Sequence, residues 1–198
     1  LGYGDLGFTG STQIKTPHID ALANSGVIFT EAYVSAPVCA PSRAGLITGR
    51  NQVNFGYDNN LTDALPQFNP EYSGLPVSEK TIADRLSELG YVNGIVGKWH
   101  LGLLDSQHPT VFGFDYFMGH RAGGWQTANP VLEKDGENQK FEGLNADILA
   151  DEAIEFLTSN RNEKFLLCWH TRAPHTRWLP VADEDIAPYE NLKIEIPN

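Results

Sequence analysis

The sequence predicts an α/β fold in which helices flank a central, largely parallel sheet. Segments with strand composition alternate along the chain with segments that have helical spacing. The apolar run KFLLCWH, residues 164–170, is typical of a strand that is buried on both faces of a parallel sheet. No internal repeat or interdomain linker interrupts this alternation, so a single domain is expected.

The first half of the chain is expected to contain two helices and a strand. Residues 18–26 predict a short helix that Gly26 closes. The segment VIFTEAYV, residues 27–34, has strand composition. Residues 41–50 predict a second helix with a proline near its first turn.

The second half is expected to contain two more helices and two strands. Residues 78–90 predict a helix with Ser78 as its cap and Gly90 as its stop. Residues 91–102 predict a strand that runs into a loop, and the last strand is the apolar run described above. Residues 145–160 predict a helix with one apolar face. That face consists of Leu149, Ala153, Phe156 and Leu157.

Segments 51–76 and 119–143 are rich in Gly, Asn and Pro and predict long loops, which are often functional. The formal net charge is -11, which argues against nucleic acid or an anionic membrane as the main partner. No apolar run approaches the length of a membrane span. Cys39 and Cys168 are too few for a disulfide framework, and Cys168, inside an apolar run, is most simply a buried thiol.

Polar side chains follow three predicted strands, at the point where each strand ends. Cys39 and Arg43 follow the first, Lys98 and His100 follow the second, and His175 follows the third. If the strands are parallel, all three groups reach the carboxyl edge of the sheet, where α/β proteins bind ligands.

Each group also has an ordinary structural interpretation. A cysteine at a helix start beside an arginine is typical of a reactive thiol, but free cysteines are more often small buried hydrophobes. A cysteine phosphatase loop needs five residues between Cys and Arg, and here there are three. Arg43 by itself would be a solvated helix charge, and Lys98 with His100 would be an exposed surface pair. In extended backbone, those two side chains point the same way.

The motif CAPSR, residues 39–43, followed by a leucine and TGR, resembles the signature of the type I, formylglycine-dependent sulfatases. The segments GYGDLG at 2–7, GKWHLG at 97–102 and APHTRW at 173–178 resemble that family in the same order. The resemblance implies an alkaline-phosphatase-like layered sandwich. It also implies that residues 1–198 are the N-terminal portion of a single catalytic domain, truncated at both ends.

The resemblance implies hydrolysis of an aryl or carbohydrate sulfate ester to an alcohol and inorganic sulfate, through a covalent formylglycine-sulfate intermediate. A dedicated maturation enzyme would oxidise Cys39 to formylglycine. Arg43 would hold the formylglycine diol, and Lys98 would bind the sulfate oxygens and formylglycine. His100 would act as a base or orienter, and His175 would donate a hydrogen bond to the substrate sulfate.

The family also implies calcium, a hard cation suited to oxygen ligands. Residue 39, as formylglycine, is the one metal ligand expected within the chain, so the isolated segment is expected to be inactive. The rival hypotheses are a phosphonate monoester or phosphodiester hydrolase and a non-catalytic binding homologue. Sulfated sugars or small molecules are the expected substrates, and the family suggests a periplasmic, secreted or lysosomal location. The remaining histidines are interpreted as structural or surface residues: His18, His108, His120 and His170.

Overall fold

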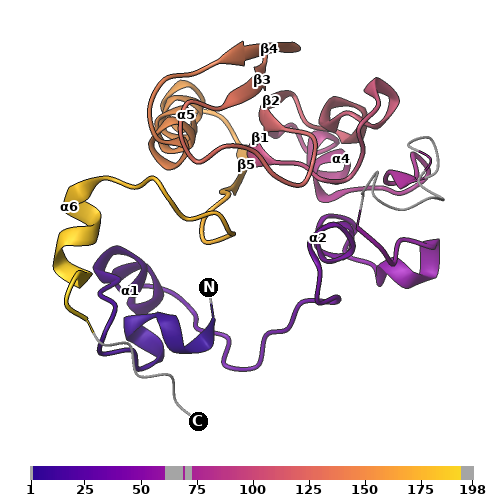
Figure 1. Cartoon of the computed structure of the whole chain (residues 1–198). Helices are drawn as coiled ribbons and strands as arrows, with labels where there is room; N and C mark the ends of the chain where they lie inside the picture. Colours follow the sequence, from indigo (N-terminus) through magenta and orange to yellow (C-terminus); the bar gives the residue numbers. More distant parts are fainter. Residues whose placement is uncertain (1, 61–68, 70–72, 193–198) are drawn as a thin grey trace. The chain divides into compact units, whose positions relative to one another are not determined.

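A computed structural model describes residues 2–60, 69 and 73–192 of the chain, which forms two compact units (Figure 1). The smaller unit contains residues 1–33 and 181–198, and the larger unit contains residues 34–180. Each unit is described by itself.

The smaller unit consists of short helices. They are the 3-10 helices η1 (Tyr3–Asp5), η2 (Gly7–Thr9) and η6 (Ala187–Tyr189) and the α-helices α1 (Pro17–Asn24) and α6 (Asp183–Ile186). Helix α1 begins at Pro17, whose fixed φ suits a first helical position. The Asp20 carboxylate accepts hydrogen bonds from the Phe8 amide and the Thr16 hydroxyl, which ties α1 to η2.

Residues 27–34 do not form the predicted strand in the structure. Val27, Phe29 and Tyr33 are largely exposed. Strand composition expresses how well a segment suits a pleated, half-buried surface, and it needs a neighbouring strand to take effect. Within the described residues, no strand pairs with this segment, so the prediction is wrong for the structure.

The larger unit contains a five-stranded sheet in the order β4-β3-β2-β1-β5. Strand β1 (Val92–Lys98) pairs in parallel with β2 (Tyr116–His120) and with β5 (Phe165–His170). Strands β3 (Val131–Lys134) and β4 (Glu137–Lys140) extend the sheet in antiparallel fashion. The predicted α/β fold with a largely parallel sheet is confirmed.

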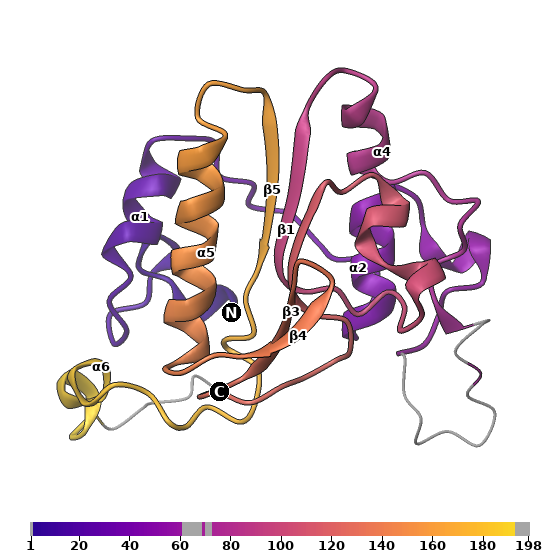
Figure 2. The same cartoon turned by 90° about the horizontal axis from the view of Figure 1, so that it is seen from above.

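Helices cover both faces of this sheet (Figure 2). Helix α5 (Asn145–Ser159) lies on one face, and α2 (Cys39–Thr48) and α4 (Ile82–Ser87) lie on the other. Between residues 34 and 180, the described part of the chain also contains the 3-10 helices η3 (Gln52–Phe55), η4 (Asp105–Gln107) and η5 (Pro109–Phe112).

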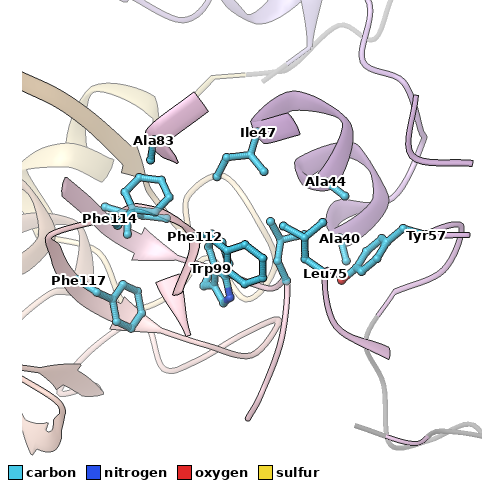
Figure 3. Packing of buried hydrophobic residues seen from close by; sticks show 12 residues of the cluster. Ala40, Ala44, Ile47, Tyr57, Leu75, Ala83, Trp99, Phe112, Phe114 and Phe117 are labelled. Carbon is cyan, nitrogen blue, oxygen red and sulfur yellow. The ribbon is translucent and has the colours of Figure 1, made fainter. Parts of the chain in front are cut away.

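The two sheet faces bury two separate apolar clusters, because successive strand residues point to opposite sides. Ile95 and Phe117 belong to the cluster under α2 and α4, whereas Val96 and Met118 belong to the cluster under α5. In the first cluster, the Trp99 ring packs on Phe112 and Phe114 while Ala40 and Ala44 of α2 lie beside Tyr57 and Leu75 (Figure 3). Trp99 is therefore a core residue.

The segment 119–143 is not a plain loop, because β3 and β4 form a hairpin within it. Asp135 and Gly136 connect the two strands, and both have positive φ, 55° and 79°. An Asp-Gly pair with positive φ at both residues is the signature of a two-residue hairpin turn. The sequence contained this signal, and the loop prediction was wrong here. The predicted loop 51–76 contains η3, and part of it lies outside the described residues.

Three other predictions need adjustment. Helix α4 is capped by Thr81, not by Ser78, because the Thr81 hydroxyl accepts from the Asp84 amide while Asp84 accepts from the Thr81 amide. On α5, three of the four predicted face residues are buried, but Leu157 is 39% exposed. Strand β5 is not buried on both faces: in the described structure only β1 pairs with it, and Trp169 is 50% exposed.

Candidate active site

Cys39 is the first residue of α2, the helix predicted to start near this point. The backbone amide of Ala40, the next residue, donates to Asn60 Oδ1 at 2.9 Å. Amides in the first turn of a helix lack intrahelical partners, so the Asn60 side chain satisfies one of them. The side chain of Asn60 thereby fixes the helix turn that presents Cys39.

Lys98 is the last residue of β1, and Gly97 before it allows two strands to approach closely. Gly97 has a φ of +110°, and a Cβ there would overlap the His170 carbonyl of β5. Only glycine fits this backbone geometry without strain. The first glycine of the GKWHLG motif thus has a structural role, and it brings the carboxyl ends of β1 and β5 together.

Arg43 extends from α2 to both of these strand ends. Its Nη1 donates to the Lys98 carbonyl at 2.8 Å and lies 2.9 Å from His170 Nδ1. Because Arg43 is four residues after Cys39, both side chains lie on the same face of α2. Burial lowers the pKa of Arg43, whereas Cys39 acts to raise it, which places the two side chains in electrostatic contact.

The Lys98 side chain is 5% exposed and interacts electrostatically with the Cys39 side chain. Burial lowers the pKa of Lys98, and the positive charges of Arg43 and Arg172 lower it further, whereas Cys39 acts to raise it. We call Cys39, Arg43 and Lys98 the cationic site. Its members come from two elements that are far apart in the sequence.

His100 is buried, but it does not continue the extended geometry of β1. The strand ends at Lys98, and His100 has a φ of 59°. The extended backbone on which the expected arrangement of Lys98 and His100 depends therefore ends before His100. The His100 amide donates to the Arg121 carbonyl at 2.9 Å, and a Cβ on Gly123 would lie 2.8 Å from His100 Nε2. His100 is thus held between the β1 exit and the loop that follows β2.

His175 lies in the exposed loop that follows β5, as the sequence predicts. Its Nδ1 is 2.6 Å from the Thr176 carbonyl. The Arg172 guanidinium donates to the carbonyls of His175, Thr176 and Arg177 and so organises this loop. The loop leaves the sheet beside the cationic site, since Gly97 and His170 are register partners. The described hydrogen bonds of the His175 side chain stay within its own loop.

Sequence reasoning missed three residues that contact the candidate site: Asn60, His170 and Arg172. His170 was interpreted as a structural or surface residue, but its Nδ1 lies within hydrogen-bond distance of Arg43, which is 127 residues earlier in the chain. Its position at the end of a parallel strand was the available signal, because Lys98 ends the neighbouring strand. Cys39 and Cys168 are both free, and burial raises the pKa of the Cys168 thiol to about 11.

The described residues do not by themselves fit a calcium site. Among residues 2–60, 69 and 73–192, no three His, Cys, Asp or Glu side chains lie close enough together to hold a metal ion. Calcium prefers six to eight oxygen ligands. Residue 39 is the one ligand assigned within the chain, so no catalytic step is derived through the metal.

In the same described ranges, no helix combines the length and apolar character that crossing a membrane requires.

The fold and the site define an α/β protein with two cationic side chains, Arg43 and Lys98, at the carboxyl edge of a parallel sheet, where proteins of this class bind ligands. The chain belongs to the sulfatase family, because the family model "Sulfatase" matches residues 1–193. N-acetylgalactosamine-6-sulfatase of Mus musculus is 32% identical to it in an alignment of 197 positions, which covers 88% of this chain and 38% of that protein.

Solved structures show the same fold. The crystal structure of Ps i-CgsB in complex with k-i-k-neocarrahexaose superposes with a TM-score of 0.89 at 35% identity, covering 98% of this chain and 47% of that chain. The structure of BT4656 in complex with its substrate D-glucosamine-2-N,6-O-disulfate has a TM-score of 0.79 at 27% identity, covering 98% and 36%. The chain thus spans less than half the length of these relatives.

Proposed function

We propose that the protein containing these 198 residues hydrolyses a sulfate ester to an alcohol and inorganic sulfate. The observation that carries the proposal is the hydrogen bond from Arg43 to the Lys98 carbonyl, which brings the buried Lys98 beside Cys39 in a chain of the sulfatase family. The CAPSR and GKWHLG motifs supply these residues, and the fold brings the two motifs together.

Cys39 is the proposed precursor of formylglycine, whose hydrated aldehyde would supply both the nucleophile and the means of releasing the covalently bound sulfate. Its Sγ stands where the diol would lie. The thiol position suits that chemistry, since the side chain is partly exposed at the start of α2 and interacts electrostatically with the buried Lys98 ammonium.

Arg43 and Lys98 supply two positive charges at this position. The sulfuryl group carries spread negative charge in its transition state, and fixed cations in a site shielded from water stabilise such charge strongly. Arg43 would hold the hydroxyls of the residue at position 39, and Lys98 would bind both that residue and the substrate sulfate. His100 would act as base or orienter, and His175 would donate to the sulfate from the loop after β5.

A sulfated sugar is the proposed substrate class. Two structural relatives support it, since one is bound to a neocarrahexaose and another to a disulfated glucosamine. The further proposals rest on family membership: residues 1–198 are the N-terminal portion of a single catalytic domain, calcium completes the site with residue 39 as a ligand, and the protein is periplasmic, secreted or lysosomal.

The test is to express the full-length protein with and without a formylglycine-generating enzyme. Trypsin should release the peptide from Thr16 to Arg43, and mass spectrometry should show that one oxygen has replaced sulfur and two hydrogens at Cys39. Only the modified protein should release sulfate from a panel of sulfated sugars and aryl sulfates. Phosphate and phosphonate esters in the same panel test the rival activity.

Cys39→Ala should abolish turnover, and Cys39→Ser should at most be sulfated once, because serine lacks the second hydroxyl. Cys168→Ala is the matched control and should stay active, since Cys168 lies within β5 and outside the sulfatase motifs. Unmodified Cys39 after co-expression, or unchanged activity in Cys39→Ala, would contradict the proposed function.

A further inference from the structure

We propose that His170 is a positioning residue that fixes the guanidinium of Arg43 at the cationic site. The inference rests on the proposed function and adds to it a residue outside the sulfatase motifs quoted above. His170 ends β5, Arg43 lies on α2, and the Lys98 carbonyl ends β1. The contact thus joins three elements at the edge of the sheet where the substrate would bind.

The geometry assigns the hydrogen-bonding roles. Arg43 Nη1 lies 2.8 Å from the Lys98 carbonyl oxygen and 2.9 Å from His170 Nδ1. A guanidinium nitrogen can only donate, and Nη1 carries two hydrogens. His170 Nδ1 must therefore accept, which places the imidazole proton on Nε2. The 3.1 Å between His170 Nδ1 and the Lys98 oxygen then separates two acceptors that share one donor group.

The surroundings keep the imidazole in this acceptor form. Burial lowers the pKa of His170 to about 4, and the positive charge of Arg43 acts in the same direction. A protonated imidazole would place a hydrogen against the guanidinium and lose the acceptor. His170 therefore stays neutral over the pH range in which most hydrolases work.

The contact has a consequence for Arg43. In the described part of the chain, its guanidinium hydrogen bonds all leave from Nη1, so Nη2 and Nε remain available for an anionic oxygen. Two acceptors on Nη1 fix the rotation of the planar group about its axis. Without His170 Nδ1, one buried hydrogen of a charged donor would lack a partner, and the guanidinium would turn away from its position.

The first experiment compares His170→Asn with His170→Leu in the full-length, matured protein. Asn places an oxygen near the position of Nδ1, whereas Leu has similar bulk and no acceptor. We expect His170→Leu to lower kcat/KM by about 10- to 100-fold, the scale of a lost hydrogen bond to a charged group. His170→Asn should stay within about threefold of the wild type. Equal losses in the two variants would overturn the proposal.

A double-mutant cycle separates positioning from general structural damage. In an Arg43→Lys background, the fork-shaped donor is absent, so His170→Leu should change kcat/KM by less than about twofold. A loss equal to that seen beside the native Arg43 would show that His170 acts independently of Arg43, against the proposal. Thermal midpoints of all variants would identify any that fail to fold.

A second readout does not depend on activity. Selective ¹⁵N-histidine labelling of the full-length protein, assigned by comparison with His170→Asn, should show His170 as the neutral Nε2–H tautomer at pH 7. A proton on Nδ1, or a charged imidazole, would overturn the proposal. If the tautomer is as expected but the wild-type protein cleaves no sulfate ester, the proposed function fails while the Arg43 contact stands.

Discussion

The cationic site and the loop after β5 are held in place by different kinds of interaction. Cys39, Arg43 and Lys98 lie on α2 and β1, and both elements contribute buried side chains to the same apolar cluster. The loop of residues 171–178 is largely exposed and is organised by the guanidinium of Arg172. Both regions contribute proposed site residues, and both leave the sheet at the same edge.

This difference indicates how firmly the side chains of each region keep their positions. Side chains on packed helices and strands keep their positions because moving them would disturb the core. A loop held by hydrogen bonds to backbone carbonyls opens more easily and adapts to a ligand. The side chains of Arg43 and Lys98 are therefore held in place by the packed core, whereas His175 lies in an exposed loop that can still move. The predictions below separate these two behaviours.

Removing a charge from the cationic site should have the largest effect on turnover. Lys98→Ala in the full-length, matured protein should lower kcat by about 10³-fold, the scale for a lost charge-stabilising group in a site shielded from water. The control is Lys140→Ala, an exposed lysine at the end of β4. Steady-state assays with a sulfate ester measure both, and a loss below about tenfold for Lys98→Ala would argue against its proposed role.

Removing the loop histidine should have a smaller effect on turnover and little effect on stability. His175→Ala should lower kcat by about 10²-fold, because the proposed donor to the sulfate is lost. The thermal midpoint should barely change, since the His175 side chain is exposed and its contact lies within its own loop. His18→Ala, an exposed histidine of α1, is the control. A normal kcat in His175→Ala would show that the loop after β5 is not part of the active site.

The buried contact between His170 and Arg43 should also affect how the stability of the protein depends on pH. The folded pKa of His170 is about 4, below the unfolded value of about 6.5. This shift contributes stability above the unfolded pKa, and the contribution is lost as the pH falls towards the folded pKa. Between pH 7 and pH 5, the free energy of unfolding of the wild type should drop by about 2 kcal/mol more than that of His170→Asn. Urea unfolding of the full-length protein measures this, and parallel pH profiles would contradict it.

The smallest effect is expected from a steric change beside His100. In Gly123→Ala the new methyl group would lie 2.8 Å from His100 Nε2, so the imidazole must shift by a few tenths of an ångström. We expect kcat to fall roughly tenfold, since small displacements of catalytic groups are costly. Gly124→Ala is the matched control, because a Cβ there meets no atom within 4 Å. Equal activity of the two variants would show that the position of His100 is not critical.

Much of the larger unit was predictable from local patterns. Helix α5 and strand β1 lie where the local pattern of apolar residues predicts them. Such a pattern needs only a short stretch of sequence. The Asp135-Gly136 turn was equally readable but was hidden in a segment rich in loop residues. The strand predicted at 27–34 was wrong because strand formation depends on a partner, which a local pattern does not contain.

The sequence by itself determined the family, through the CAPSR and GKWHLG motifs, and with it the residue types that the proposed chemistry needs. Their spacing along the chain also placed Cys39 and Arg43 on one helix face. Only the tertiary structure decided that Arg43 donates to the end of β1 and to His170 on β5, and that His100 leaves the strand geometry of Lys98. The physical reason is that a hydrogen bond between residues 127 positions apart depends on the packing of whole elements. Local sequence patterns specify those elements without specifying how they meet.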